Sequence, residues 1–337
     1  MGCGACVFSE STKQYWNCSK FTYGTRLDEW TTVTCDFMSD DFGQARIVCA
    51  LGFWQGGRAN GGKSTGTAYF DNIRVREVTD ELYMRESKHI RLFLEPTKVV
   101  VSNEVIDQWL ANLDKQYEAY AWLVGGTPHE GRKLAILSTQ AREYWAVAGY
   151  PIIWVVDFVE GTLNDIRDNQ DWCFGIMHEI GHVFNIGNSS WDWNDEMFAN
   201  FRMQYGLEVN EGCVWQDDRD KNEKHLYKGS EIRNFYNWDY RSTISSQVND
   251  NGIHWMLANL TNHRIDANTT IGWEPFKLAF SEMNTASGNP WGNTKYSKFE
   301  YLVKRVSYHA SQLYDKEIDL LSTFSQSELA SVKKQLQ

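Results

Sequence analysis

A short apolar segment that carries two histidines and a glutamate constrains this chain more than any other feature. Within residues 172–186, His178, Glu179 and His182 form the pattern His-Glu-x-x-His. Residues four apart on an α-helix lie on one face, about 6 Å apart along the axis, so both imidazoles can bind one cation. Burying these polar side chains in an apolar segment is costly unless they share such a partner. The segment therefore predicts a buried zinc-binding helix, on which Glu179 is placed to act as the general base.

The simplest alternative is a pair of histidines that are solvated or satisfied by structural hydrogen bonds. The pattern is short enough to occur by chance, so its surroundings decide. Gly187 follows the apolar segment, where a glycine that ends a helix is expected. Asn185 and Asn188 stand where a metzincin would have glycine and histidine, which excludes that class of zinc site. We therefore expect a zinc helix whose third ligand lies farther along the chain.

A second helix is predicted at residues 193–201, with Asn194 or Asp195 as its N-cap. Glu196 follows the second histidine by 14 residues, which is enough for a turn and an antiparallel return. We expect Glu196 to be the third zinc ligand, with Asp195 as the main alternative; the simpler reading is that Glu196 only complements the helix dipole. Asn200 lies one turn later on the same face and is suited to a hydrogen bond to a ligand.

The arrangement of these motifs resembles a known family. His-Glu-Ile-Gly-His followed by Glu-x-x-x-Asn is similar to the zinc site of the enhancin-type gluzincin peptidases, a group that includes gut mucin-degrading enzymes. Residues 91–96, 117–120 and 148–152 resemble segments upstream of that family's zinc helix, and residues 272–277 resemble its C-terminal helical part. The likeness extends over roughly residues 86–320.

This resemblance implies an α+β fold with a zincin (gluzincin) catalytic domain: a small sheet, an active-site helix and a helical C-terminal subdomain. It implies zinc as the cofactor, bound by His178, His182 and Glu196, with Glu179 as the general base. It also implies O-glycosylated, mucin-like glycoproteins as substrates, with possible contacts to the glycan. The substrate-binding residues stay unknown at this point.

Residues 1–79 are predicted to be rich in β-structure, with strands at residues 30–37, 45–54 and 67–78. Residues 66–75 resemble the closing strand of jelly-roll carbohydrate-binding modules. Because 79 residues are few for a jelly roll, we expect a partial β-sandwich that corresponds to its C-terminal part. Several aromatic residues can stack on a sugar ring, although each is more often a core residue: Tyr23, Trp30, Trp54 and Tyr69.

A glycine-rich stretch at residues 57–64 matches the P-loop pattern letter for letter. A phosphate cradle requires a helix to begin at the Lys-Ser pair, because the helix N-terminus binds the anion. A predicted strand follows instead. We interpret the stretch as a hairpin loop and expect no nucleotide binding.

Residues 80–337 are predicted to form the zinc metallopeptidase domain, with an α/β part at about 86–200 and a mainly helical part at 201–337. Strands are expected at 90–94, 134–137 and 151–156, and a helix from Ser102 to the glycines at 125–126. Later helices are expected at 254–260, 275–283 and 299–321, followed by a last helix with a capping box from Ser325 to Glu328.

Composition limits the partners and the compartment. The net charge of −11 argues against nucleic acid or an anionic membrane as the main partner. No apolar run reaches 18 residues, so no membrane span is expected. Five of the seven cysteines precede residue 50, which predicts one or two N-terminal disulfides in a secreted or cell-surface protein, with Cys173 as a free core thiol. The first residues do not read as a signal peptide, and we expect the chain to be part of a longer secreted protein.

These observations favour a secreted zinc metalloendopeptidase that cleaves mucin-like glycoproteins. Two alternatives stay open: a glycan-binding or adhesion protein with an inactive peptidase-like domain, and a general gluzincin that does not require glycans. The residue that stabilises the oxyanion is expected among Tyr236, Tyr240, His225 and His254, and candidate sugar platforms are Trp191, Trp193 and Trp238.

Overall fold

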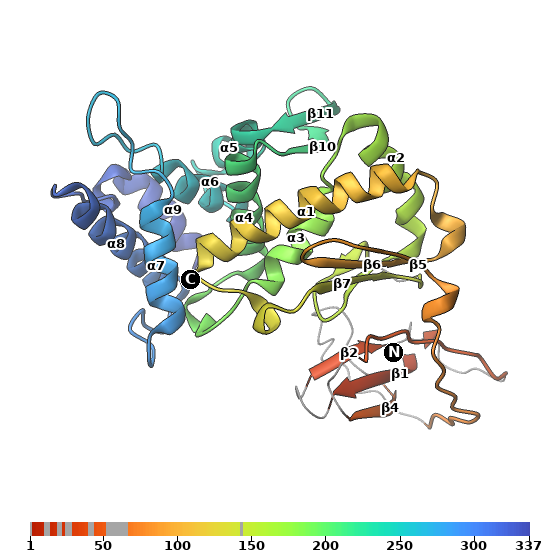
Figure 1. Cartoon of the computed structure of the whole chain (residues 1–337). Helices are drawn as coiled ribbons and strands as arrows, with labels where there is room; N and C mark the ends of the chain where they lie inside the picture. Colours follow the sequence, from red (N-terminus) through yellow and green to blue (C-terminus); the bar gives the residue numbers. More distant parts are fainter. Residues whose placement is uncertain are drawn as a thin grey trace. The chain divides into compact units, whose positions relative to one another are not determined.

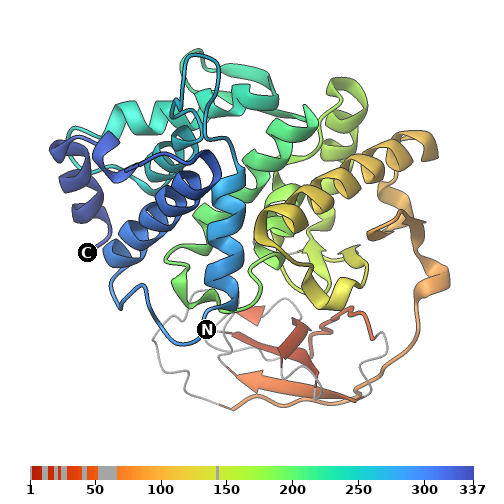
Figure 2. The same ribbon diagram turned by 60° about the vertical axis from the view of Figure 1, so that its left-hand side comes forward.

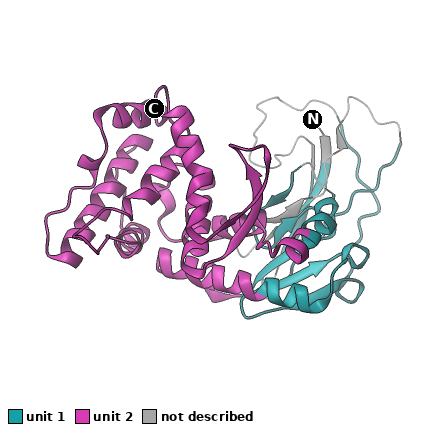
Figure 3. Ribbon diagram, turned by 90° about the horizontal axis from the view of Figure 1, so that it is seen from above, with its two compact units in different colours: residues 1–110, 133–164 teal, residues 111–132, 165–337 magenta. Residues whose placement is uncertain are grey.

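The computed structural model describes residues 2–9, 14–18, 22–23, 29–39, 44–51, 67–141 and 144–337. These residues form an α+β structure with nine α-helices and three β-sheets (Figure 1). The chain divides into two compact units, residues 1–110 with 133–164 and residues 111–132 with 165–337 (Figure 3). The division at residue 80 into a partial sandwich and a peptidase domain stays a prediction.

The N-terminal sheet belongs to the first unit and is built on β1 (Gly2–Ser9). This strand pairs antiparallel with β2 (Gln14–Cys18), β3 (Thr22–Tyr23) and β4 (Ala45–Leu51). Cys6 on β1 is buried and disulfide-bonded, so the prediction of an N-terminal disulfide is confirmed. The predicted strand at 45–54 is confirmed as far as Leu51.

Two predicted strands of this region are wrong. In the described structure residues 30–37 and 67–78 form no strand, and Asn72 within the second stretch has a positive φ of 55°. Trp30 and Tyr69 are 74% and 79% exposed. A β-favouring sequence becomes a strand only where another strand accepts its backbone hydrogen bonds, which local pattern does not guarantee. Trp54, the side chain of Tyr23 and residues 57–64, which were predicted to form a hairpin loop, lie outside the described residues. The jelly-roll resemblance stays a prediction.

A five-stranded mixed sheet completes the first unit. Its order is β5-β6-β7-β9-β8, and the three central strands run parallel. The parallel strands are buried along most of their length, as parallel sheets require. The strands are β5 (Tyr83–Glu86), β6 (Ile90–Leu94), β7 (Leu134–Ser138), β8 (Ala146–Val147) and β9 (Ile152–Trp154).

The strands predicted at 90–94 and 134–137 are confirmed, whereas the one predicted at 151–156 ends early. Val156 already begins α2 (Val156–Asn169), a helix that the sequence pattern did not reveal. The predicted long helix is confirmed as α1 (Asn103–Val124). Among the described residues, no helix is both long and apolar enough to cross a membrane.

The second unit is mainly helical (Figure 1 and Figure 2). A β-hairpin interrupts the helices after α4 and was not predicted. The elements are α3 (Phe174–Val183), α4 (Asp195–Asn210), β10 (Cys213–Asp218), β11 (Glu223–Lys228), α5 (Ile232–Thr243), α6 (Asp250–Leu260), α7 (Glu274–Thr285), α8 (Lys295–Tyr314) and α9 (Gln326–Gln335).

The helices predicted in this part are present, with shifted ends. The helix predicted at 299–321 ends at Tyr314, because Asp315 has a positive φ of 50° and closes the helix. The capping box from Ser325 to Glu328 at the start of α9 is confirmed. Gly187 has the expected positive φ of 68°, but α3 ends four residues earlier, at Val183.

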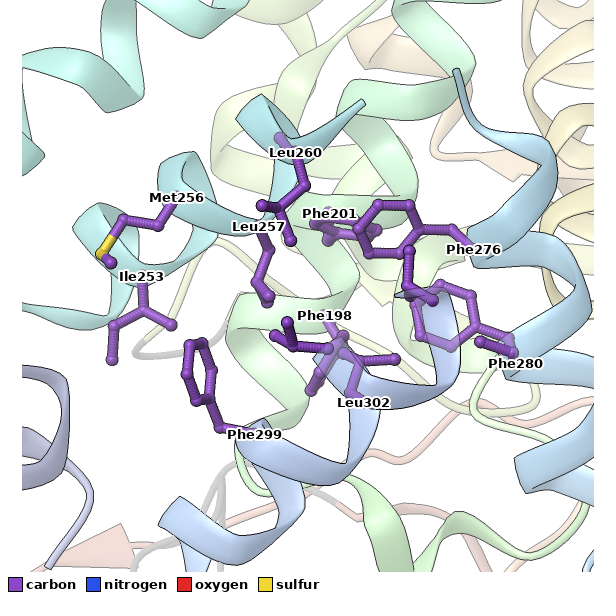
Figure 4. Close-up of a cluster of buried hydrophobic side chains, with 14 of the residues drawn as sticks. Phe198, Phe201, Ile253, Met256, Leu257, Leu260, Phe276, Phe280, Phe299 and Leu302 are labelled. Atoms are coloured by element: carbon purple, nitrogen blue, oxygen red, sulfur yellow. The ribbon is translucent and has the colours of Figure 1, made fainter. Parts of the chain in front are cut away.

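The core of this unit surrounds α4, whose residues from Met197 to Leu207 are buried except for the half-buried Asn200. Aromatic and aliphatic side chains from α4, α6, α7 and α8 meet there (Figure 4). Trp191 and Trp193 are 1% and 7% exposed and belong to this core, so they do not offer platforms to a sugar. The helix that carries Glu196 and Asn200 is therefore held rigidly in the unit.

Candidate metal centre

The helix α3 starts at a buried turn. The Oδ1 atom of Asp171 accepts hydrogen bonds from the backbone nitrogens of Cys173 (3.0 Å) and Trp215 (3.1 Å), which ties the start of α3 to β10. Burial raises the pKa of Asp171 to about 6 although these two hydrogen bonds lower it. Cys173 is buried and free, as predicted, and its φ of 68° turns the chain into the helix.

The side chains of α3 divide into a buried and a partly open stripe. Ile176, Met177, Ile180 and Gly181 are buried, as expected for the apolar face of a helix. The half-buried residues are adjacent pairs that recur every four residues and so lie on one side of the helix: Phe174, Gly175, His178, Glu179, His182 and Val183. The two histidines and the glutamate therefore share the open stripe.

A glycine allows α4 to approach α3 closely. A Cβ atom on Gly181 would lie 2.7 Å from the carbonyl oxygen and 3.0 Å from the Cα of Ala199. No side chain fits against backbone atoms at that distance, so the approach depends on glycine. Asn194, one of the two predicted N-caps, accepts a hydrogen bond from the nitrogen of Met197 and fixes the start of α4.

This approach brings three donor atoms together. The Nε2 atoms of His178 and His182 are 3.0 Å apart, and Oε2 of Glu196 lies 3.1 Å from the first and 3.4 Å from the second. Ligand atoms around a tetrahedral zinc ion are about 3.3 Å apart when the bonds are about 2.0–2.1 Å. The side chain of Glu196 is 76% exposed, which leaves one side of the cluster accessible. The donor set and its spacing fit zinc.

The hydrogen bonds on the far side of each ring determine which nitrogen faces the cluster. Nδ1 of His178 lies 2.9 Å from Oδ1 of Asn200, and Nδ1 of His182 lies 2.7 Å from Oδ2 of Asp195. Both partners are acceptors, so Nδ1 carries the proton and donates in each ring. The lone pairs of both Nε2 atoms then point toward Glu196. Three lone-pair donors at this distance repel one another unless a positive charge joins them.

The electrostatics of the cluster agree with this geometry. Burial lowers the pKa of His182, but its contacts with Asp195 and Glu196 outweigh burial and raise it to about 10. The two histidines hold the pKa of Glu196 well below its ordinary value. The cluster therefore favours a positive charge at its centre, which a proton or a metal ion can supply.

Asp195 is placed as a support for His182. Its Oδ1 atom accepts a hydrogen bond from Nδ2 of Asn185 (3.3 Å) and lies 3.9 Å from the guanidinium of Arg202. Arg202 is buried and also donates to the carbonyl oxygen of Gly181 (3.0 Å). The carboxylate predicted as the alternative ligand thus contacts the Nδ1 side of His182, away from the convergent Nε2 atoms. The sequence signal was an acidic pair in the first turn of α4, and it did not show which carboxylate faces the cluster.

The structure brings together the residues predicted as ligands, His178, His182 and Glu196, and the hydrogen bond predicted for Asn200 is present. Glu179 lies beside His178 on the open stripe of α3. The assignment of ligands and base stays a prediction.

Among the described residues, the four candidates for oxyanion stabilisation make their contacts with residues other than His178, His182 and Glu196. Tyr236 and His254 are fully buried against each other, with ring centroids 3.9 Å apart, and burial lowers the pKa of His254 to about 3. Tyr240 donates a hydrogen bond to Glu328 on α9, and His225 packs on Tyr227 within the hairpin. We therefore assign no oxyanion donor.

Comparisons with known proteins give partial likenesses. No protein-family model matches the chain. Curated proteins named TRPM8 channel-associated factor 3, from Mus musculus and Rattus norvegicus, are each 24% identical over 197 residues. The match covers 58% of this chain but only 20% of those proteins, so the chain spans about a fifth of the length of these curated relatives.

Solved structures are similar at low sequence identity. A functionally unknown conserved protein from Bacillus anthracis str. Ames has a TM-score of 0.50 at 13% identity, covering 77% of this chain and 52% of that chain. A mutant of a functionally unknown conserved protein from the same organism has a TM-score of 0.52 at 13% identity, covering 74% and 48%. A metallopeptidase from Bacteroides thetaiotaomicron has a TM-score of 0.46 at 14% identity, covering 92% and 55%. The two Bacillus structures share the fold over about three quarters of this chain.

Proposed function

We propose that this chain is a zinc-dependent endopeptidase. The observation that carries the proposal is the convergence of His178, His182 and Glu196 on one point beside the open stripe of α3. Two imidazoles, one carboxylate and one open side form the donor set of a catalytic rather than a structural zinc site. Bound zinc would supply a Lewis acid that polarises the scissile carbonyl and lowers the pKa of a water toward about 7.

The side chains around the cluster have distinct tasks in this proposal. Glu179 accepts the proton of the attacking water and passes it to the leaving amine. Asp195 and Asn200 accept the Nδ1–H hydrogen bonds and so hold both imidazoles in the tautomer that binds a metal. Arg202 holds Asp195 and the carbonyl of Gly181, which keeps α3 and α4 in register.

The proposed substrates are O-glycosylated, mucin-like glycoproteins outside the cell. The sequence resemblance to enhancin-type gluzincins supports the substrate class. The disulfide at Cys6 supports a secreted or cell-surface location, since disulfides persist in oxidising compartments. A general peptidase that ignores glycans is the alternative within the same reaction class.

A second candidate function is binding without turnover. The curated relatives are named as channel-associated factors, a name that describes association with another protein rather than catalysis. In that case the cluster would be a metal-binding support and Glu179 would have no chemical task. Adhesion through a glycan is one form of this candidate.

Mass-spectrometric cleavage of one Ser/Thr-rich peptide, with and without GalNAc, separates these functions. The zinc-loaded chain is compared with a chelated sample. Chelator-sensitive cutting beside the sugar supports the glycopeptidase, and equal cutting of both peptides indicates a general peptidase. If a zinc-loaded sample cuts neither peptide, this result contradicts the proposal and favours the binding function.

A further inference from the structure

An aromatic residue occupies the open stripe of the metal helix. Phe174 lies one turn before His178 and is half-buried, whereas Ile176, Met177 and Ile180 of the same helix are buried. Its ring is 13° from parallel to the His178 ring, with centroids 6.4 Å apart. Phe174 therefore presents apolar surface directly beside the cluster.

A second aromatic residue extends this surface. The ring of Phe235 on α5 is half-buried, and its centroid lies 6.2 Å from that of Phe174. The guanidinium of Arg219 lies 4.2 Å from the Phe235 ring centroid and pairs with Asp239. Tyr227 contacts the same ring edge-on at 5.9 Å. Phe235 is thus held in place before anything binds, which lowers the entropic cost of using it as a contact.

We propose that Phe174 and Phe235 form an apolar subsite that binds a hydrophobic side chain of the substrate next to the scissile bond. The inference rests on the proposed function. One extended peptide residue spans about 3.3–3.6 Å, so a ring 6.4 Å from the His178 ring lies within reach of a side chain one or two residues from the cut. Rigid, partly exposed aromatic rings continuous with a metal centre select apolar groups, because contact removes apolar surface from water.

The test uses two hydroxamates that chelate zinc equally and differ only in their apolar group. Acetohydroxamate carries a methyl group, and N-hydroxy-3-phenylpropanamide carries a phenyl group. The dissociation constant of each is measured by calorimetry on the full, zinc-loaded chain. We expect the phenyl compound to bind about tenfold or more tightly, and Phe235→Ala to abolish most of this preference while retaining zinc.

Phe324→Ala is the matched control, because Phe324 is also half-buried and its ring packs on Phe299, with centroids 6.1 Å apart. This control should keep the full preference. Should Phe235→Ala not fold, Phe235→Gln replaces the ring by an amide of similar length and should also lose the preference.

Three outcomes overturn the subsite. An equal preference in Phe235→Ala and the parent chain, or no preference in the parent chain, removes the subsite but leaves the metal centre intact. Failure of the zinc-loaded chain to bind either hydroxamate contradicts an open coordination position at the zinc, and with it the proposed reaction and the subsite together. A position-specific enrichment of Leu, Phe or Met beside the cut in peptide-library cleavage, flattened in Phe235→Ala, would confirm the subsite independently.

Discussion

The carboxylate of Asp195 lies 2.7 Å from Nδ1 of His182, and this contact directs the other nitrogen of the ring toward Glu196. Two adjacent acidic residues of α4 therefore act on opposite sides of one imidazole. Asp195 contacts Nδ1 of the His182 ring, and Glu196 lies near Nε2 on the opposite side. The order of the pair along α4 determines which carboxylate can be a ligand.

Asp195→Ala should lower zinc affinity about 10–100-fold, because it removes the acceptor that orients His182. Asp195→Asn keeps an oxygen acceptor and should therefore lower zinc affinity less than Asp195→Ala does. Competition with a chromophoric chelator measures both. Asp168→Ala is the control, since this carboxylate is exposed and its ion pair in the described structure is with its neighbour Arg167. Unchanged affinity in Asp195→Ala would contradict the supporting role.

Gly181→Ala should destabilise the fold by about 1–3 kcal/mol, because the new Cβ would meet the backbone of Ala199 at 2.7 Å. Zinc affinity should fall with it, since α3 and α4 must separate. Denaturant unfolding and a zinc titration test both effects. Gly161→Ala on α2 has no atom within 4 Å of its Cβ and should not destabilise, because alanine favours a helix. Similar stabilities for the two variants would refute the close approach.

Asp171→Asn should become more stable relative to the parent chain as the pH rises through about 6. Burial raises the pKa of Asp171 from 3.8 to about 6, so between these values the folded chain binds more protons there than the unfolded chain. The contribution of Asp171 to the free energy of unfolding consequently falls as the pH rises, by up to about 3 kcal/mol. Asparagine keeps the Oδ1 acceptor but does not ionise.

Urea unfolding of both chains from pH 4 to pH 7, with chelator present to exclude metal binding, covers the range in which this difference develops. Parallel pH profiles for the two chains would show that the buried carboxylate does not titrate as described.

The candidate site was predictable because its signals are local. The i, i+4 spacing of His178 and His182, and the Asn194 cap before Glu196, follow from helix geometry alone. The close approach at Gly181 could not be predicted in this way, because it depends on Ala199, which belongs to a different helix, α4. The sequence therefore predicted the residues that converge, His178, His182 and Glu196, but not how Asp195 and Arg202 support them.

The missed elements lack such local signals. Val156 starts α2 inside an apolar run that begins as a strand, with no glycine, proline or capping residue at the change. The hairpin of β10 and β11 has mostly polar strands and a charged turn, so it shows no clear alternation. Tyr236 and His254 were predicted as candidates for oxyanion stabilisation because their side chains can donate hydrogen bonds. They lie on the buried faces of α5 and α6.

The most direct measurement of the central claim compares Glu179→Gln with the parent chain at equal zinc content. Zinc is quantified in both samples, and the rate of cleavage of the Ser/Thr-rich glycopeptide is followed by mass spectrometry. We predict the same zinc content and a rate lowered by about 10²–10⁴-fold or more, because the variant cannot accept the proton of the attacking water. An undiminished rate at equal zinc content would contradict Glu179 as the base and the proposed reaction.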